Sequence, residues 1–113
     1  ITNSEAKTIC LCAEFPLKPL DKIIYKKIDF SNLVEEIARI CYDEKIQSII
    51  IEGGSNTIQQ FIDTNFWNEA RVFKSEPILL NGIKAPKLIS AQKTTEQKIA
   101  NDTLIIFKNI IND

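Results

Sequence analysis

A short apolar run, an acidic residue and a pair of glycines stand together in residues 48–57, SIIIEGGSNT. The unbroken β-branched run at 49–51 is typical of a parallel strand that is buried on both faces. Apolar residues at positions 58, 61 and 62 then have the spacing of one helix face, and Thr64-Asn65 favours the end of that helix. The stretch therefore predicts a strand, a glycine turn and a helix, in that order.

The residues before this stretch predict two further strands and a helix. Thr8 to Ala13 and Ile23 to Ile28 have strand-like patterns, and a proline-containing turn separates them. Ser31 is a candidate N-cap for a helix whose first turn carries Glu35 and Glu36, which suit the positive end of the helix dipole. Together with the run at 49–51 these elements predict a strand–helix–strand crossover unit.

The residues after the second helix favour a different sheet arrangement. Trp67 to Lys74 is predicted to be a strand, and Ser75 to Lys87 a long ordered loop punctuated by proline and glycine. Lys93 to Ile99 and Thr103 to Asn109 resemble two antiparallel strands joined by a short turn. The fold class expected is α/β, with an antiparallel strand pair at the C-terminus, in a single domain spanning residues 1–113.

Composition and charge limit the classes of partner. With 113 residues the chain supports one domain, and 44% hydrophobic residues beside 26% charged ones indicate an ordinary globular core. The formal net charge is −1, from 14 basic and 15 acidic residues, so the overall field recruits neither nucleic acid nor an anionic membrane. The partners expected are small molecules, bound at a local site.

The cysteines and the apolar runs bear on compartment and metal binding. No apolar run approaches the roughly 20 residues that span a bilayer, and the first residues lack the pattern of a secretion signal. Cys10, Cys12 and Cys41 have no framework spacing, and there is no histidine to complete a zinc set. We expect buried reduced thiols, a cytoplasmic protein and no metal site.

The glycine pair marks the candidate binding site. Gly53 and Gly54 follow the predicted strand, at the edge where α/β sheets place their ligands. A Gly-Gly turn lets the backbone approach a ligand closely, and the N-terminus of the next helix offers N–H groups to a phosphate. Ser55, Asn56 and Thr57 add further hydrogen-bond donors. The alternative is a tight strand-to-helix turn with no ligand.

Glu52 is the candidate substrate ligand, because its carboxylate would point from the strand end into the same crevice and accept hydrogen bonds from sugar hydroxyls or pyrimidine N–H groups. The alternative is a solvated or salt-bridged strand end. Asp63, Asn68 and Glu69 are better explained as a solvated helix end and turn. The chain has no Ser/His/Asp, Cys/His or Walker-type set of residues. It therefore lacks the catalytic residues that a hydrolase or a nucleoside triphosphatase of these types needs.

Four segments, in order along nearly the whole chain, carry a resemblance to a known family. They are the strand, Glu-Gly-Gly and helix at 48–62, the strand with a preceding acidic residue at 67–73, the glycine-to-Ala-Pro loop at 82–87, and the strand at 101–107. Together they resemble the C-terminal part of the RibD-type reductase domain of riboflavin-biosynthesis deaminase/reductases, closest to the version in Bacteroidetes-like bacteria.

The resemblance implies a dihydrofolate-reductase-like fold, with a mixed sheet and flanking helices, in a homodimer. It also implies NADPH-dependent reduction of the ribosyl group of 5-amino-6-(5-phosphoribosylamino)uracil to the ribityl form. Glu52 would contact the substrate. The residues implied to line the cofactor phosphates are Gly53, Gly54, Ser55, Asn56, Thr57, Ile58, Gln59 and Gln60. It identifies no catalytic residue.

The chain also departs from the family pattern. A full reductase domain is longer, and its earlier half, with other cofactor contacts and most of the substrate-phosphate site, has no counterpart here. The zinc deaminase signature is absent. We therefore expect the C-terminal portion of a reductase domain, inactive in isolation. Two alternatives stay open: a non-catalytic binding or dimerisation module of the same fold, and a reductase acting on a pterin or folate.

Overall fold

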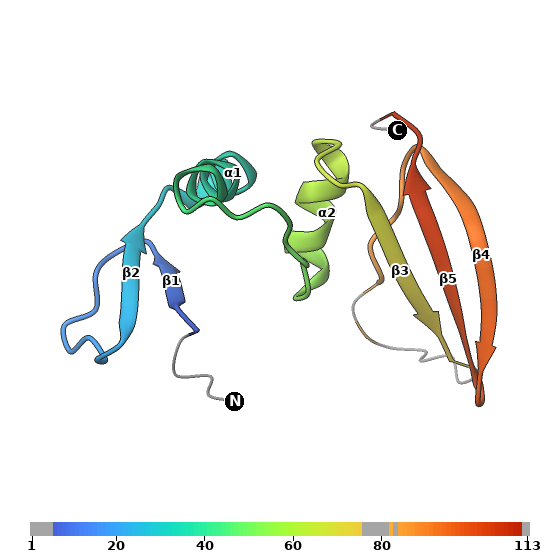
Figure 1. Ribbon diagram of the computed structural model, residues 1–113, viewed down its shortest axis with the longest axis horizontal. Helices are drawn as coiled ribbons and strands as arrows, with labels where there is room; N and C mark the ends of the chain where they lie inside the picture. Colours follow the sequence, from blue (N-terminus) through green and yellow to red (C-terminus); the bar gives the residue numbers. More distant parts are fainter. Residues whose placement is uncertain (1–5, 76–81, 83, 112–113) are drawn as a thin grey trace. The chain divides into compact units, whose positions relative to one another are not determined.

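The computed structural model describes residues 6–75, 82 and 84–111, and its chain divides into two compact units, residues 1–48 and 49–113. Each unit is described by itself. The first contains β1 (Thr8–Cys12), β2 (Ile23–Lys27), a 3-10 turn (Phe30–Asn32) and α1 (Leu33–Asp43) (Figure 1). The second contains α2 (Ser55–Asp63), β3 (Glu69–Lys74), β4 (Ala91–Ile99) and β5 (Asp102–Asn109).

In the first unit β1 and β2 pair in parallel, with Thr8 opposite Ile23 and Cys12 opposite Lys27. The ladder continues one step further, because the Ile28 N–H donates to the Cys12 carbonyl at 2.9 Å. The core of this unit consists of buried aliphatic side chains from the end of β2 and from α1, namely Ile28, Leu33 and Ile40, with Leu11 and Ile37 packed against them. Both predicted strands and the predicted helix are confirmed.

The start of α1 differs from the prediction. Ser31 lies inside the 3-10 turn, and its N–H and hydroxyl both donate to the Asp29 carboxylate, at 3.0 and 2.7 Å. Asn32 precedes α1 without a side-chain cap. The prediction that Ser31 caps the helix is therefore wrong, because Asp29 caps the preceding turn instead. The Asp29 N–H in turn donates to Glu36 at 2.9 Å, which ties the turn to the first turn of α1.

In the second unit three antiparallel strands form a sheet in the order β3-β5-β4. β4 and β5 make the hairpin that the sequence predicts, closed by Ala100 and Asn101, with Ala100 in the left-handed region at φ 53°. A register shift interrupts the β4–β5 ladder between Lys93 and Thr95. β5 is the central strand and contributes the buried Ile105.

The predicted second helix is confirmed as α2. Phe61 and Ile62 are buried, and the ring of Phe61 lies 6.1 Å from that of Phe66 in the following turn. The helix ends where predicted, because the Asn65 N–H donates to the Ile62 carbonyl at 2.9 Å with Asn65 in the left-handed conformation at φ 59°. This turn redirects the chain from α2 towards β3.

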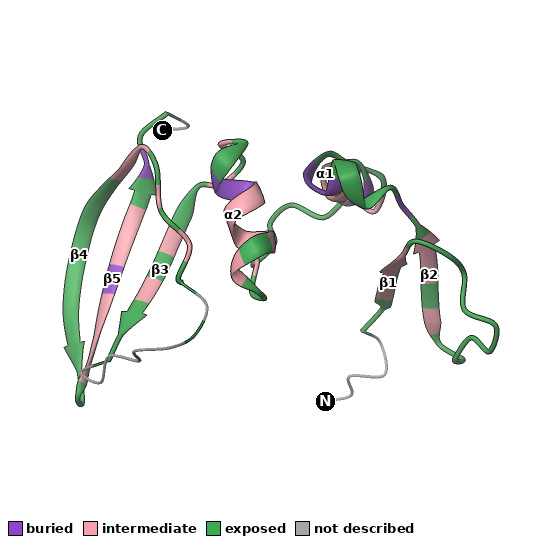
Figure 2. Cartoon of the chain, turned by 180° about the vertical axis from the view of Figure 1, so that it is seen from behind, coloured by how far each residue is buried: buried purple, intermediate pink, exposed green. Residues whose placement is uncertain are grey.

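The predicted strand at 49–51 is not formed. Residues 46–52 belong to no strand, and Ile49 and Ile50 are 41% and 86% exposed (Figure 2). A β-branched run becomes a buried strand only when neighbouring strands and covering layers are present, and no strand in the described ranges pairs with it. The crossover unit is therefore left without its second strand.

The α/β class is confirmed, since the described residues form two α-helices and two sheets, one parallel and one antiparallel. The dihydrofolate-reductase-like mixed sheet stays a prediction. Most of the predicted ordered loop, namely residues 76–81 and 83, lies outside the described residues.

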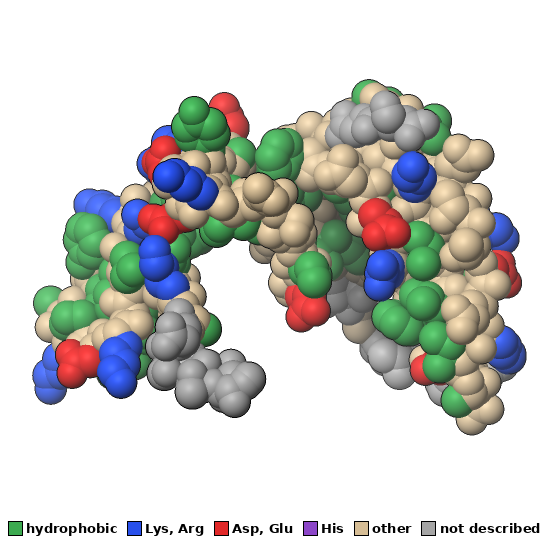
Figure 3. Space-filling view, viewed as in Figure 1, with side chains coloured by type: hydrophobic (Ala, Val, Ile, Leu, Met, Phe, Trp, Pro, Cys, Tyr) green, Lys and Arg blue, Asp and Glu red, His purple; other side chains and the backbone are tan. Residues whose placement is uncertain are grey.

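On the face in view in Figure 3, basic and acidic side chains are interspersed. No helix in the part of the chain that is described has the length and apolar character needed to cross a membrane.

Candidate functional site

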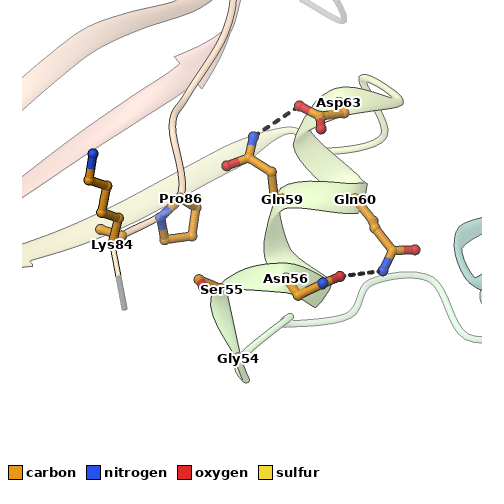
Figure 4. A pocket seen from close by; sticks show the side chains of 9 residues that line it. Gly54, Ser55, Asn56, Gln59, Gln60, Asp63, Lys84 and Pro86 are labelled. Atoms are coloured by element: carbon orange, nitrogen blue, oxygen red, sulfur yellow. Dashed lines mark hydrogen bonds between the residues drawn. The ribbon is translucent and has the colours of Figure 1, made fainter. Parts of the chain in front are cut away.

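A pocket of about 720 Å³ lies within the second unit, between α2 and the segment 84–86. Its lining residues are Gly54, Ser55, Asn56, Gln59, Gln60 and Asp63 on the helix side, and Lys84, Ala85 and Pro86 on the other (Figure 4). Pockets of roughly 300 to 1,000 Å³ are typical of small-molecule and cofactor sites. One face of α2, from its N-cap Gly54 to its last residue Asp63, therefore lines a space large enough for part of a dinucleotide.

The pocket brings together five of the eight residues predicted to line cofactor phosphates, which are Gly54, Ser55, Asn56, Gln59 and Gln60. Gly53, Thr57 and Ile58 do not line it. Neither does Glu52, which is exposed just before the glycine turn and has no hydrogen bond or ion pair with the described residues. The roles predicted for these residues remain predictions.

The glycine turn is open on its outer side. A Cβ built on Gly53 or Gly54 would meet no heavy atom within 4 Å. Gly53 has φ 145°, a conformation that side-chain-bearing residues rarely adopt, whereas Gly54 is the N-cap of α2 with φ −58°. No side chain caps this end of α2. The first N–H groups of a helix have no partner inside the helix, so the arrangement suits an incoming anion.

A side-chain amide joins the two walls of the pocket. Gln59 donates through Nε2 to the Lys87 carbonyl at 3.0 Å, and its Oε1 accepts from the Lys87 N–H at 2.7 Å. The same Nε2 also donates to Asp63 Oδ1 at 2.9 Å (Figure 4). The Gln59 amide is thus engaged with protein groups on α2 and on the opposite wall, which sequence reasoning did not anticipate.

The second wall was also missed as a part of the site. Lys84, Ala85 and Pro86 were noted only for a family resemblance, because nothing in their local sequence places them beside α2. Among the described residues that line this pocket, Lys84 is the only basic side chain, and Asp63, near the C-terminal end of α2, the only acidic one. No signal in the local sequence would have found Lys84, because its place beside α2 goes with the contact between Gln59 and Lys87.

Asn68 and Glu69, which the sequence assigned to structure, contact protein groups, whereas Asp63, assigned in the same way, lines the pocket. Glu69 pairs with Arg71 at 3.6 Å on β3, and the Asn68 carbonyl accepts from the Asn109 N–H at 3.0 Å. The predicted burial of the three thiols is wrong, because Cys10 is exposed and Cys12 and Cys41 are only half-buried. The two-stranded sheet of the first unit leaves Cys10 uncovered. Within the described ranges, no group of three or more His, Cys, Asp or Glu residues is placed to hold a metal ion.

Comparison with known families agrees with the resemblance found in the sequence. A family model described as the RibD C-terminal domain matches residues 1–110. No curated protein matches the chain. The match covers all four segments that carry the resemblance, and it implies a reductase-type function in riboflavin biosynthesis. The chain belongs to the RibD C-terminal domain family.

Proposed function

We propose that these residues are the C-terminal portion of an NADPH-dependent reductase of riboflavin biosynthesis. The reaction is reduction of the ribosyl group of 5-amino-6-(5-phosphoribosylamino)uracil to the ribityl form. The observation that supports it is the uncapped N-terminus of α2, which opens through an unobstructed glycine turn onto a pocket of about 720 Å³ in a chain of this family.

The residues present fit the phosphates of a dinucleotide. The open space around Gly54 lets a pyrophosphate approach the backbone, and the partial positive charge at the N-terminus of α2 favours it. The Ser55 hydroxyl and the Asn56 amide, both lining the pocket, add hydrogen-bond donors. The cofactor, when bound, supplies the hydride that reduces the carbonyl carbon of the opened sugar.

Glu52 is the proposed substrate ligand. Its exposed carboxylate stands two residues before Gly54 and has no partner among the described residues, so it is available to accept hydrogen bonds from sugar hydroxyls or pyrimidine N–H groups. The substrate would thereby be held next to the turn that carries the cofactor phosphates. We further propose that the protein acts in the cytoplasm as a homodimer on small-molecule substrates.

The test is a kinetic assay of the full-length protein, which follows the loss of reduced-nicotinamide absorbance with the phosphoribosylaminouracil as substrate. Turnover with this substrate, and none with dihydrofolate or a dihydropterin, is the expected result. Turnover of dihydrofolate instead would mean that the enzyme acts on a folate and not on the aminouracil. Tight NADPH binding without turnover of any of the three would identify a binding module that has lost catalysis.

A further inference from the structure

The two walls of the pocket are joined at Lys87. Gln59 and Lys87 lie 28 positions apart, and the amide of one exchanges two hydrogen bonds, of 3.0 and 2.7 Å, with the backbone of the other. This pairing uses both the N–H and the carbonyl of Lys87, as a β-bridge uses both groups of a strand residue. The Lys87 side chain takes no part in these bonds. The contact therefore fixes the backbone of the segment at Lys87 and does not depend on the Lys87 ammonium group.

The fixed backbone at Lys87 also limits where Lys84 can lie. Pro86 has a restricted φ, and a residue that precedes a proline, as Ala85 does, is confined to extended conformations. The two-residue link from Lys84 to Lys87, Ala85-Pro86, is therefore stiff, and anchoring one end restricts the position of the other. Figure 4 shows Lys84 and Pro86 across the pocket from Ser55 and Gln59.

The charges around the pocket favour an anion beside Lys84. Lys84 is exposed, and none of the ion pairs or hydrogen bonds of the described residues involves it. The positive end of the α2 dipole lies at Gly54, in the same pocket. Asp63 lies near the other end of α2, and Gln59 donates a hydrogen bond to its carboxylate. An ammonium on a flexible stem is a common partner for phosphate.

We propose that Lys84 pairs with a phosphate group of the dinucleotide cofactor, and that Gln59 is the positioning residue that holds Lys84 at the pocket through the Lys87 backbone. The inference rests on the proposed function. It extends that function, because it assigns a phosphate contact to the wall opposite α2, where neither motif nor resemblance had placed one.

The first experiment compares Lys84→Ala with Lys87→Ala in the full-length protein. Both variants remove one lysine charge from the same segment, but Lys87→Ala leaves the two main-chain hydrogen bonds with Gln59 in place. Fluorescence titration with NADPH should give a Kd about tenfold higher for Lys84→Ala, and an unchanged Kd for Lys87→Ala. The salt dependence of binding should also weaken only in Lys84→Ala.

Titration with NADH identifies which phosphate Lys84 contacts. If Lys84→Ala weakens NADPH and leaves NADH unchanged, the contact is with the 2′-phosphate. If it weakens both equally, the contact is with the pyrophosphate. Either pattern supports the pairing, whereas equal effects of Lys84→Ala and Lys87→Ala would show that only general charge attraction is at work and overturn it.

The second experiment tests positioning by a double-mutant cycle. Gln59→Ala should raise the Kd for NADPH by a factor similar to that of Lys84→Ala. The double variant should bind no more weakly than Lys84→Ala alone, because Gln59 acts through a lysine that is already gone. Additive losses would mean that Gln59 does not act through Lys84. If Gln59→Ala does not fold, the Lys84→Ala and Lys87→Ala comparison still decides the phosphate contact.

The wild-type protein separates the two levels of failure. If it binds neither NADPH nor NADH, the proposed function fails and this inference with it. If it binds NADPH normally and Lys84→Ala binds equally well, the proposed function stands and the inference alone is overturned.

Discussion

Asn109 donates its side-chain amide to Asn65 Oδ1 at 2.8 Å, and so joins the end of β5 to the turn that follows α2. The same Nδ2 donates to the Trp67 carbonyl at 2.9 Å, while Asn109 Oδ1 accepts from the Ile111 N–H at 2.9 Å. Asn109 is 2% exposed, so its amide is largely shielded from water and these contacts stand in for its hydration.

Replacing Asn109 with Asp should therefore destabilise the protein. The substitution replaces the Nδ2 donor of Asn109 with a carboxylate oxygen. That oxygen would face the Asn65 and Trp67 oxygens, in a site shielded from water. We expect a loss of about 2 kcal/mol or more in the free energy of unfolding, measured by urea denaturation. Asn101→Asp, the same change at an exposed position of the β4–β5 turn, should leave the free energy of unfolding nearly unchanged. Equal stability of the two variants would contradict the assigned role of Asn109.

The two glycines should respond differently to side chains. Gly54 has an ordinary φ of −58° and open space around it, so Gly54→Val should fold normally but lower NADPH affinity several-fold or more by filling the phosphate space. Gly53 has φ 145° and does not line the pocket. Gly53→Val should therefore cost stability, by about 1–3 kcal/mol.

Fluorescence titration and thermal melting of both variants separate these effects. Unchanged NADPH affinity in a folded Gly54→Val variant would place the cofactor phosphates elsewhere.

Glu52→Gln should weaken the substrate more than the cofactor. Hydrogen bonds to a charged group contribute on the order of 1.5 to 3 kcal/mol, so kcat/KM for the aminouracil should fall roughly ten- to a hundredfold, with the KM for NADPH nearly unchanged. Steady-state kinetics of the full-length protein measures both. A raised KM for NADPH beside an unchanged KM for the aminouracil would reverse the assignment.

The first unit should lose stability in acid. A hydrogen bond from Lys7 at 2.8 Å, the charge of Lys7 and, more weakly, that of Lys26 hold the pKa of Glu44 below its ordinary value of 4.5. The Asp29 N–H and then Arg39 lower the pKa of Glu36 in the same way. Because these carboxyls have a lower pKa folded than unfolded, their contribution is present above pH 4.5 and is lost as the pH falls through the folded pKa.

Thermal melting over a pH series, followed by circular dichroism, measures this loss. Glu44→Gln should flatten the dependence of the melting temperature on pH below about 4.5. Glu35→Gln removes a carboxylate that has no hydrogen bond or ion pair with the described residues, and it should keep the wild-type slope. Identical slopes in all three proteins would remove Glu44 as a source of the acid sensitivity.

The apolar run at 49–51, in which Ile49 and Ile50 are exposed, should drive self-association of the 113-residue chain. Ile50 is 86% exposed in a β-branched run that has no strand partner in the described structure, and such segments pair readily with other chains. Ile50→Lys should raise the monomer fraction in light scattering. Leu17→Lys, at a fully exposed position of the β1–β2 connection, is the matched control and should not. Equal monomer fractions in the two variants would assign any association to another surface.

The elements that the sequence predicts correctly are those specified by local signals. The spacing of Ile58, Phe61 and Ile62 defines a helix face wherever the helix packs, and the hairpin at 91–109 depends on neighbouring residues alone. The run at 49–51 was predicted wrongly because burial on both faces depends on strands and layers supplied by other segments.

The site divides in the same way. Its helix side follows from the glycine pair and the start of α2, both readable along the chain. The opposite wall depends on the pairing of Gln59 with Lys87, 28 positions away, and no local pattern encodes a contact over that separation. Ser31 shows the same difficulty at short range, because its residue type suits an N-cap but the 3-10 turn that Asp29 caps places Ser31 before the start of α1.

The order of strands in the second unit affects how it is made during translation. β5 lies between β3 and β4 yet follows both in the chain, so neither strand has its hydrogen-bonding partner until residues 102–109 have emerged from the ribosome. Chains emerge at roughly 5–20 residues per second, and β3 must wait for the nascent peptide to lengthen by a further 28 residues or more, from Lys74 to Asp102. Throughout that interval the newborn chain exposes β3, joined by β4 once residues 91–99 have emerged, and it is then that a chaperone has the most to protect.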